Sequence, residues 1–269
     1  MQIKTKAKLG ETSNVRYING YVNMSTVNLN VYCFEVDGVL IDTGSPRLLK
    51  DFTSFFKDAD IDKVVITHSH EDHTGGAEFL QRNYQLPIYI NEKSINESRE
   101  RASYPLYRKF FWGKRQPFRA QPIGKTFESR NASWEVIQTP GHAEDHLVFL
   151  NKNTGQLFSG DLYIQTRTKL MLKTERVPTI IESIERVLSY DFNEMFCCHA
   201  GYVKDGHKAL TKKLNYLKEL TEEVLSLQKQ GYNEKEIHNL LFKRKYPITY
   251  LSLGEWDSKH IISSIITRK

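Results

Sequence analysis

Hydrophobic and polar residues alternate along residues 15–42, and a period of two is typical of strands with one buried face. Val27 and Leu29, for example, fall on one face while the residues between them fall on the other. Asp37-Gly38 has the composition of a tight hairpin turn. The pattern therefore predicts consecutive antiparallel strands. Short apolar runs predict further strands at residues 63–67 and 86–90, and a strand pair is expected at residues 125–129 and 133–138.

A helical period replaces this alternation toward the end of the chain. Apolar residues at helical spacing in a Lys/Glu-rich setting predict one long amphipathic helix from His207 to Gly231. Residues 233–236 have the composition of a capping box and open a second helix through Leu241, and a third is expected to begin at Ser252. Further helices are expected at residues 46–57, 75–81 and 180–188. The chain thus divides into an α/β domain over residues 1–206 and a C-terminal helical appendage over residues 207–269.

The charge balance is mildly basic, with 38 Lys and Arg against 32 Asp and Glu, a net charge of +6. This balance weakly favours anionic partners. The first residues have no apolar segment typical of a signal peptide, and no run approaches the roughly 18 apolar residues of a membrane span. We therefore expect a cytoplasmic protein without a membrane partner. The cysteines, Cys33, Cys197 and Cys198, are odd in number and include an adjacent pair, which argues against a disulfide framework.

Three of the nine histidines and one aspartate fall in the six-residue window from His68 to His73. Imidazole and carboxylate are the usual ligands of zinc and similar divalent metals. In an extended segment His68 and His70 point to the same side, whereas Asp72 and His73 point elsewhere once the chain turns toward a helix. The spacing therefore favours two adjacent metals over one. A solvated histidine-rich turn is the structural alternative, but the window directly follows a buried strand, where ligands are usual in α/β proteins.

The motif His68-x-His70-x-Asp72-His73 followed by Gly75-Gly76 resembles the signature of the metallo-β-lactamase superfamily, whose members are mostly binuclear zinc hydrolases. The resemblance extends over about residues 15–205. It implies an α/β fold, a four-layer αββα sandwich of the metallo-β-lactamase type, with the catalytic domain at residues 1–206. The C-terminal helical extension resembles those of glyoxalase II-like and lactamase-β-2-like members. In those proteins it contributes to the substrate entrance or to subunit contacts, so a homodimer is left open.

Three further motifs extend the ligand set by resemblance. The sequence Pro-Gly-His ending at His142 matches the family's next ligand motif, and Ser-Gly-Asp ending at Asp161 matches the motif whose aspartate bridges the metals. His199, followed by Ala-Gly, matches the last motif. The resemblance thus implies a first metal held by His68, His70 and His142, and a second held by Asp72, His73 and His199, with Asp161 shared between the two.

Residues next to these motifs are assigned supporting roles by the same resemblance. Asp42, in the motif Leu40 to Pro46, is expected to hydrogen-bond ligand residues without binding metal, or alternatively to cap the following helix. His146 is expected beside the ligands or the substrate, with a core role as the alternative. Cys197 and Cys198 depart from the small or proline residues that usually precede the last histidine. They are expected to be inert core thiols, with an influence on metal preference as the alternative.

Residues 99–119 combine seven basic residues, one acidic residue and six aromatic residues. The mixture is typical of a lid that walls a small-molecule pocket or packs against a second subunit, and we expect Arg108 and Trp112 to contact substrate. The alternative is a nucleic-acid surface that stacks bases and binds phosphates. Tyr163 is a further candidate for a contact to a substrate oxygen, with core packing as its alternative. Glu71 is expected to point away from the metals, toward solvent or a structural partner.

The resemblance implies a hydrolase that binds two Zn²⁺ ions, with Mn²⁺ or Fe²⁺ as other metals, and uses a hydroxide that bridges them. Asp72 and Asp161 are assigned to catalysis in this scheme. The expected substrate is a small ester, thioester or lactone that is anionic or contains a carbonyl group. The first alternative is a phosphodiesterase or ribonuclease with the same metal site, motivated by the basic segment at residues 99–119. The second is an iron-dependent oxidoreductase of the same fold, against which the complete ligand set argues.

Overall fold

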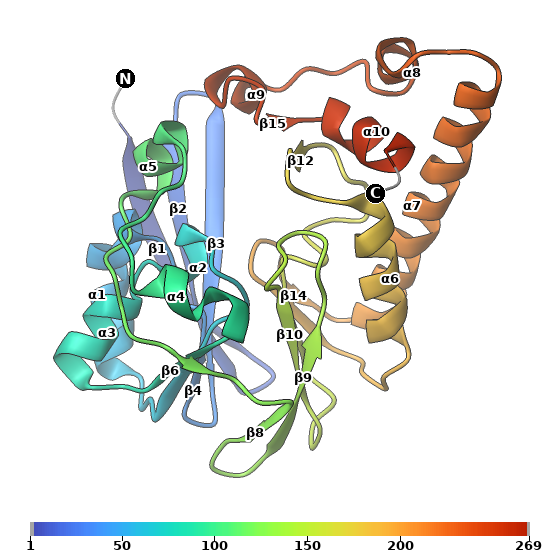
Figure 1. The fold of residues 1–269 in the computed structure, drawn as a ribbon. Coiled ribbons are helices and arrows are strands. Elements are labelled where there is room, and N and C mark those ends of the chain that lie inside the picture. Colours follow the sequence, from blue (N-terminus) through green and yellow to red (C-terminus); the bar gives the residue numbers. More distant parts are fainter. Residues whose placement is uncertain (1–2, 268–269) are drawn as a thin grey trace.

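The computed structural model describes residues 3–267 and shows two β-sheets packed between two layers of helices (Figure 1). Within this range the first sheet has seven strands in the order β1-β2-β3-β4-β5-β6-β7. Neighbours from β1 to β4 are antiparallel, and neighbours from β4 to β7 are parallel. The strands are β1 (Lys4–Thr12), β2 (Val15–Met24), β3 (Val27–Val36), β4 (Val39–Ile41), β5 (Lys63–Val65), β6 (Ile88–Ile90) and β7 (Gln121–Pro122).

The second sheet has the order β14-β13-β11-β10-β9-β8. Its strands β11 and β13 are parallel, with Gly160 opposite Cys197, so the residues that follow these two strands emerge side by side. The strands are β8 (Thr126–Glu128), β9 (Ser133–Gln138), β10 (Leu147–Asn151), β11 (Leu157–Gly160), β13 (Met195–Cys197) and β14 (Gly201–Val203). A separate two-stranded sheet pairs β12 (Met171–Leu172) with β15 (Trp256–Asp257).

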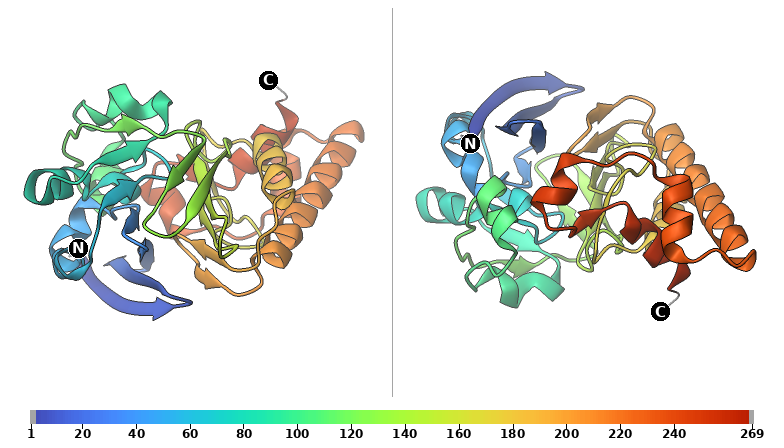
Figure 2. Two further views of the ribbon diagram at one scale, coloured as in Figure 1. Left: turned by 90° about the horizontal axis from the view of Figure 1, so that it is seen from below. Right: turned by 90° about the horizontal axis from the view of Figure 1, so that it is seen from above.

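Helices cover the outer face of each sheet (Figures 1 and 2). On the side of the first sheet lie the 3₁₀ helix η1 (Pro46–Leu48), α1 (Leu49–Asp58), α2 (Glu71–Thr74), α3 (Ala77–Tyr84), η2 (Glu92–Ser94), α4 (Ile95–Ser98) and α5 (Leu106–Trp112). On the side of the second sheet lie α6 (Val177–Leu188) and α7 (Gly206–Lys229). The chain ends with α8 (Glu234–Leu241), α9 (Pro247–Leu251) and α10 (Lys259–Ile266).

Aromatic side chains fill the space between the two sheets. Phe34 on β3 contacts Phe158 on β11 and Phe196 on β13, with ring centroids 5.7 and 5.6 Å apart. Trp134 on β9 lies 5.5 Å from Phe158 by the same measure, and its side chain is fully buried. These large rings bury much apolar surface and hold the sheets in a fixed relation. The loops at one end of both sheets are positioned by this core.

The C-terminal helices pack on the body of the protein instead of forming a core of their own. Leu210 and Leu217 of α7 and Ile261 of α10 share one buried apolar cluster with Val148 and Leu157 of the second sheet. Ile248 of α9 belongs instead to the cluster around the first sheet. Seen from above, the segment after α7 therefore crosses the ends of both sheets (Figure 2).

Most of the predicted elements are confirmed. The antiparallel run over residues 15–42 is present, and Asp37 and Gly38 both have positive φ, of 53° and 79°, as a type I′ hairpin turn requires. The long helix predicted from His207 to Gly231 is α7, which spans Gly206–Lys229. The capping box at Asn233 forms as expected, because its side chain and that of Glu236 each accept from the backbone N–H of the other residue.

Some elements differ from the prediction. The third C-terminal helix does not begin at Ser252, which instead follows α9; Leu253 and Gly254 then have φ of 53° and 78°, and α10 begins at Lys259. The positive φ of Leu253 and Gly254 prevents a helix from running through these residues. The short helix α9, which Pro247 opens, was not predicted. Strand β1 was missed because it is largely exposed, and β10 because its fully buried run lacks alternation. Among the residues that the structure describes, none of the helices has the length and apolar character of a membrane span.

Candidate active site

The seven candidate metal ligands meet at one end of the two sheets. Four follow β5 or lie in α2, and the other three follow strands of the second sheet. The glycine before Asp161 is required by the backbone: Gly160 has φ of 49°, and a Cβ there would lie 2.6 Å from His146 Nε2. The ligands from the first sheet are His68, His70, Asp72 and His73, and those from the second are His142, Asp161 and His199.

Three imidazoles form one half of the cluster. His70 Nδ1 lies 3.0 Å from His68 Nε2 and 3.1 Å from His142 Nε2. Burial and the neighbouring imidazoles hold the pKa of His68 well below its usual range, and burial with the Arg108 charge does the same for the pKa of His70. Both rings are therefore neutral, and neutral imidazole is the form that binds a metal.

Carboxylates dominate the other half. Asp72 Oδ2 lies 3.8 Å from His73 Nε2 and 3.7 Å from His199 Nε2. Asp161 lies between the halves, because its Oδ2 is 3.4 Å from His142 Nε2 and 3.0 Å from His199 Nε2. Its other oxygen, Oδ1, is 3.5 Å from His73 Nε2. A single carboxylate therefore faces both sets of imidazoles.

The residues fit a pair of divalent cations. His73 Nε2 and Asp161 Oδ1 are buried atoms that have no hydrogen-bond partner among residues 3–267, which is costly unless a ligand satisfies them. The donor atoms within each set lie within 4.8 Å of one another, as ligands of a common ion do. Imidazole nitrogen and carboxylate oxygen are the donors that zinc prefers. Among the residues that the structure describes, the sets that could hold an ion are His68, His70 and His142; Asp72, His73 and His199; His68, His73 and Asp161; and Asp42, His73 and Cys198.

Asp42 lies beneath the cluster and is fully buried. Its Oδ2 accepts a hydrogen bond of 2.8 Å from His73 Nδ1 and another of 2.8 Å from Thr67 Oγ1, while its Oδ1 accepts from the Thr67 amide. The Cys198 thiol also donates to Oδ2 at 3.1 Å, and burial together with Asp42 keeps the pKa of that thiol well above its usual range. Cys198 is therefore a protonated donor beneath the site. Cys197 Sγ accepts from the Ile164 amide at 3.3 Å and donates to the Gly160 carbonyl at 3.4 Å.

An open cavity of about 420 Å³ lies over the cluster. Its floor includes His70, Asp161 and His199. Its walls are mostly apolar and come from β3, from α5, from β12 and from the segment after α7; they include Leu29, Phe111, Trp112, Leu172, Ile248 and Trp256. Small-molecule sites have this character, an apolar wall with a few polar groups at one point.

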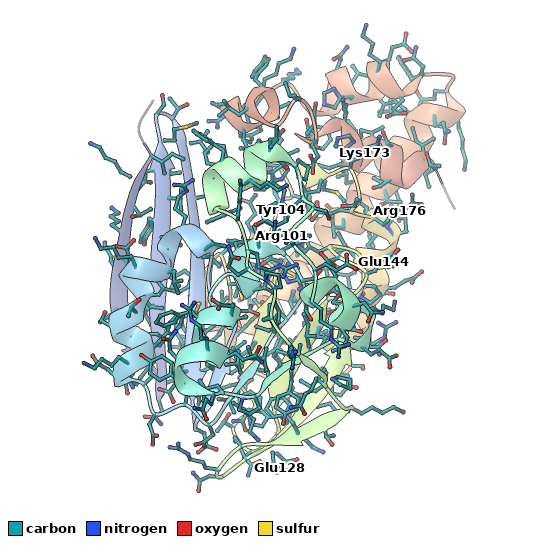
Figure 3. The ribbon with its side chains drawn as sticks, turned by 60° about the vertical axis from the view of Figure 1, so that its left-hand side comes forward. Arg101, Tyr104, Glu128, Glu144, Lys173 and Arg176 are labelled. Carbon is teal, nitrogen blue, oxygen red and sulfur yellow. The ribbon has the colours of Figure 1, made fainter. Side chains whose placement is uncertain are left out.

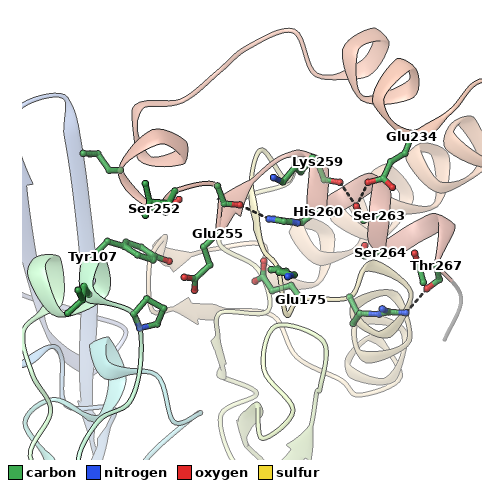
Figure 4. Close-up of a pocket in the computed structure, with 17 residues that line it drawn as sticks. Tyr107, Glu175, Glu234, Ser252, Glu255, Lys259, His260, Ser263, Ser264 and Thr267 are labelled. Atoms are coloured by element: carbon green, nitrogen blue, oxygen red, sulfur yellow. Dashed lines mark hydrogen bonds between the residues drawn. The ribbon is translucent and has the colours of Figure 1, made fainter.

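A second, larger cleft of about 840 Å³ adjoins this cavity (Figure 4). Tyr107 and Glu175 line both spaces. In Figure 4 Tyr107 extends from α5 toward Glu255, and Lys259 and His260 of the C-terminal segment lie beyond. Figure 3 shows Arg101 and Tyr104, from the segment before α5, on the same face of the molecule as three residues from the second half of the chain. These three residues are Glu144, Lys173 and Arg176.

Comparison with known proteins decides the family. The sequence model described as "Metallo-beta-lactamase superfamily" matches residues 27–229. The chain belongs to the metallo-beta-lactamase superfamily. The family and the αββα fold predicted from the sequence are thereby confirmed.

Individual members of the superfamily are similar over parts of their length. The chain is 31% identical over 128 residues to a protein of Emericella nidulans named thioesterase pkgB, covering 46% of this chain and 32% of that protein. It is 24% identical over 213 residues to a beta-lactamase-like protein 2 homolog of Drosophila melanogaster, covering 73% and 66%. The latter supports the lactamase-β-2-like branch. The chain thus spans about a third to two thirds of the length of these curated relatives.

A solved structure of the superfamily has the same fold. A beta-lactamase domain protein from Burkholderia ambifaria superposes with a TM-score of 0.68 at 16% identity, over 96% of this chain and 87% of that one. Such an identity speaks for the fold alone.

Two groups that accept hydrogen bonds from candidate ligands were not predicted from the sequence. Glu175 accepts a hydrogen bond from His142 Nδ1 and another of 2.7 Å from the Leu172 amide. The Asn30 carbonyl accepts from His199 Nδ1 at 2.5 Å. A backbone carbonyl leaves no trace in residue type, so Asn30 could not be recognised. Glu175 stands in a loop without a motif. Its only signal in the sequence is that an acidic residue lies just before the start of a helix.

The other predicted site residues differ in where they lie. His146 is buried beside the cluster, where its Nε2 accepts from the Asp161 amide at 3.0 Å and its Nδ1 contacts Thr139 Oγ1 at 2.7 Å. Trp112 and Arg108 line the cavity. Tyr163 does not: it packs against the apolar cluster of the second sheet, and its hydroxyl contacts Thr166 at 3.3 Å. The position of Tyr163 therefore matches the core-packing alternative.

Glu71 is not in solvent. It is buried and forms a bidentate ion pair with Arg108. In the same basic segment Arg115 is also buried, and its guanidinium donates to the carbonyls of Ser98 and Glu97. Two of the seven basic residues of this segment therefore hold the fold together instead of facing a partner.

Proposed function

We propose that this superfamily member is a metal-dependent hydrolase that cleaves thioesters of compact, mostly apolar acyl groups. The observation that carries this proposal is the apolar cavity of about 420 Å³ directly over the cluster of imidazoles and carboxylates. In this proposal one ion is held by His68, His70 and His142 and the other by Asp72, His73 and His199, with Asp161 shared. Zn²⁺ is the metal that best matches these donors.

When bound, the two ions would supply Lewis acidity, which polarises the thioester carbonyl and lowers the pKa of a water toward about 7. The protein's part is to fix the ligands. Carbonyl and carboxylate oxygens can only accept, so the contacts to Asn30, Glu175 and Asp42 place the ring hydrogens of His199, His142 and His73 on Nδ1. Their Nε2 atoms face the cluster, and each offers its lone pair to a metal once any proton on it has been displaced.

Asp161 has the central role among the acidic residues. The imidazoles of His199 and His73 oppose the effect of burial and hold the pKa of Asp161 well below its usual range, so its carboxylate is ionised. An anion between two cations reduces their mutual repulsion. Together with Asp72 it would also offset the positive charge of the ions. This charge balance is the catalytic role that we propose for Asp72 and Asp161.

The walls of the cavity favour the acyl part of the substrate. Leu29 of β3, Leu170 and Trp256 of β15 are half-buried and provide apolar surface that an acyl chain or ring can cover, and burial of such surface contributes about 25 cal/mol per Å². The relatives named as thioesterases support a thioester over a lactone or an oxygen ester.

The phosphodiesterase or ribonuclease alternative has less support. It was motivated by the basic segment at residues 99–119, but Arg108 and Arg115 are bound within the protein. The iron-dependent oxidoreductase remains a prediction to be excluded by metal analysis.

The proposal is tested by release of free thiol from N-acetylcysteamine thioesters carrying acetyl, hexanoyl or benzoyl groups. We expect turnover that disappears on chelation, returns on addition of Zn²⁺, and is lost in His70→Ala and Asp161→Asn. His207→Ala serves as the matched control, because His207 is exposed and belongs to none of the candidate ligand sets.

Two results would overturn the proposal. One is thioester turnover that survives chelation and both ligand substitutions. The other is a protein loaded with zinc that cleaves RNA or phosphodiesters and none of the thioesters.

A further inference from the structure

A buried ion pair joins the turn at residues 68–73, which carries four candidate ligands and is called the metal-binding turn below, to the wall of the cavity. Glu71 stands between two candidate ligands, His70 and Asp72, and its side chain is only 1% exposed. Arg108 of α5 donates from Nε to Oε1 at 2.8 Å and from Nη2 to Oε2 at 2.6 Å. The two parallel bonds fix the direction of the guanidinium as well as its distance.

Burial of this pair has a desolvation free energy that metal binding does not account for. Burying a carboxylate and a guanidinium removes both from water, and only good geometry offsets the loss. Glu71 is not among the residues that could hold an ion. Its side chain points to α5 instead, where Arg108 is 15% exposed.

Helix α5 forms one wall of the cavity through Tyr107, Phe111 and Trp112, which we call the aromatic roof. Its C-terminal end is held elsewhere, because Arg47 Nε donates to the Phe111 carbonyl at 2.7 Å. Its middle, next to Tyr107, is held to the metal-binding turn by Arg108. Arg108 thus connects the roof to the turn beneath it through a contact that involves neither a candidate ligand side chain nor substrate.

We infer that Glu71 and Arg108 are positioning residues that fix the aromatic roof above the cluster and so set which acyl groups the cavity admits. This inference rests on the proposed function for its substrate and on geometry for its mechanism. It revises the prediction that Arg108 contacts substrate, since the Nε and Nη2 donors of its guanidinium are directed to Glu71.

The competing role for Arg108 is direct binding of an acidic group on the substrate. The two roles differ in what Glu71 does. If Arg108 bound substrate, Glu71→Gln would free the guanidinium and strengthen the binding of an acidic acyl group. If the pair positions the roof, Glu71→Gln and Arg108→Gln act alike, and the double variant is no worse than either single one.

The experiment uses the zinc-loaded protein labelled with 5-fluorotryptophan, in which the Trp112 resonance is assigned by its loss in Trp112→Phe. We expect Glu71→Gln and Arg108→Gln to shift or broaden the Trp112 resonance in the same way, while that of core Trp134 stays unchanged. Arg108→Lys, which keeps the charge but not the bidentate geometry, should give an intermediate effect. The matched control is Arg82→Gln, which removes an exposed ion pair to Glu78.

Kinetics provide the second readout. Both single variants should raise KM for hexanoyl and benzoyl thioesters about tenfold with little change in kcat, whereas acetyl thioester should respond less. An unmoved Trp112 resonance in both single variants overturns the inference, and so does tighter binding of a succinyl thioester in Glu71→Gln alone. The fluorine spectra need no turnover, so they test the positioning of the roof even if thioester hydrolysis fails, and the KM values test the selection of acyl groups.

Discussion

At the scale of single residues, the candidate ligands are oriented by partners that can only accept a hydrogen. Asp42, Glu175 and the Asn30 carbonyl each lie against the Nδ1 of a different histidine. Such contacts fix the tautomer and the ring plane before any metal arrives, and they raise the basicity of the ring. The acidic partners also raise the pKa of their histidines: burial lowers the pKa of His142, but Glu175 outweighs it.

Glu175→Gln tests this role. The amide oxygen can still accept from His142 Nδ1, but the negative charge is lost, and we expect zinc affinity to fall by about 10- to 100-fold. A competition titration with a chromophoric chelator measures the affinity. Glu182→Gln, an exposed position on α6, should leave it unchanged. Equal affinities for Glu175→Gln and the parent protein would contradict the assignment.

At the scale of elements, α7 supports the loop that carries Asp161. Lys213 is buried and reaches from this helix to the carbonyls of Leu162 and Tyr163, at 2.9 and 2.6 Å. Burial lowers the pKa of Lys213 to about 8. The helix that was predicted as an appendage therefore contacts the residues next to a candidate metal ligand, and the division at residue 206 stays a prediction about folding units.

Lys213→Met removes these contacts while keeping the apolar stem. Each buried carbonyl that loses its donor costs about 1–3 kcal/mol, partly offset because a buried charge is also removed. We expect a net loss of roughly 1–3 kcal/mol in the free energy of unfolding, read from urea denaturation. Lys212→Met, at an exposed position of the same helix, should change it by less than about 0.5 kcal/mol. Identical urea midpoints for the two variants would show that the contacts do not matter.

The elements also show how far the sequence can be interpreted. The strands of residues 15–42 and helix α7 were predicted because each has a clear period and a polar face. Strand β10 was not predicted, because a fully buried run has no alternation. The break at Gly254 was not predicted either, because a positive φ depends on tertiary contacts. In the site the histidines stood in motifs, but the pairing of Glu71 with Arg108 joins residues 37 positions apart and leaves no local pattern.

At the scale of the whole molecule, the candidate metal site spans the junction between the two sheets. His68 and His70 follow the first sheet, and His142, Asp161 and His199 follow the second. Ions held by both sets would cross-link the halves of the sandwich. A ligand that binds only the folded state stabilises it by mass action, so metal binding and global stability should be coupled.

Metal removal should therefore lower Tm. With zinc at about 1,000 times its Kd the stabilisation is about 4 kcal/mol, which corresponds to a shift on the order of 10 °C for a chain of this size. Differential scanning calorimetry of the chelated and the zinc-loaded protein measures the shift. The same comparison in Asp161→Asn should give a much smaller difference. A Tm that is indifferent to chelation would place the metals outside this cluster.

The shift in Tm should also depend on pH. Burial lowers the pKa of His199, but the Asp161 carboxylate outweighs it and raises the value to about 9 in the metal-free protein. Protonated His199 thus stabilises the metal-free fold fully below its unfolded pKa of about 6.5, and this contribution is lost as pH rises through about 9. A metal must displace the same proton, so its affinity rises over the same interval. Both effects act in one direction: the Tm difference between zinc-loaded and metal-free protein should widen from about pH 6.5 to 9, and a difference that stays constant or narrows would contradict this linkage.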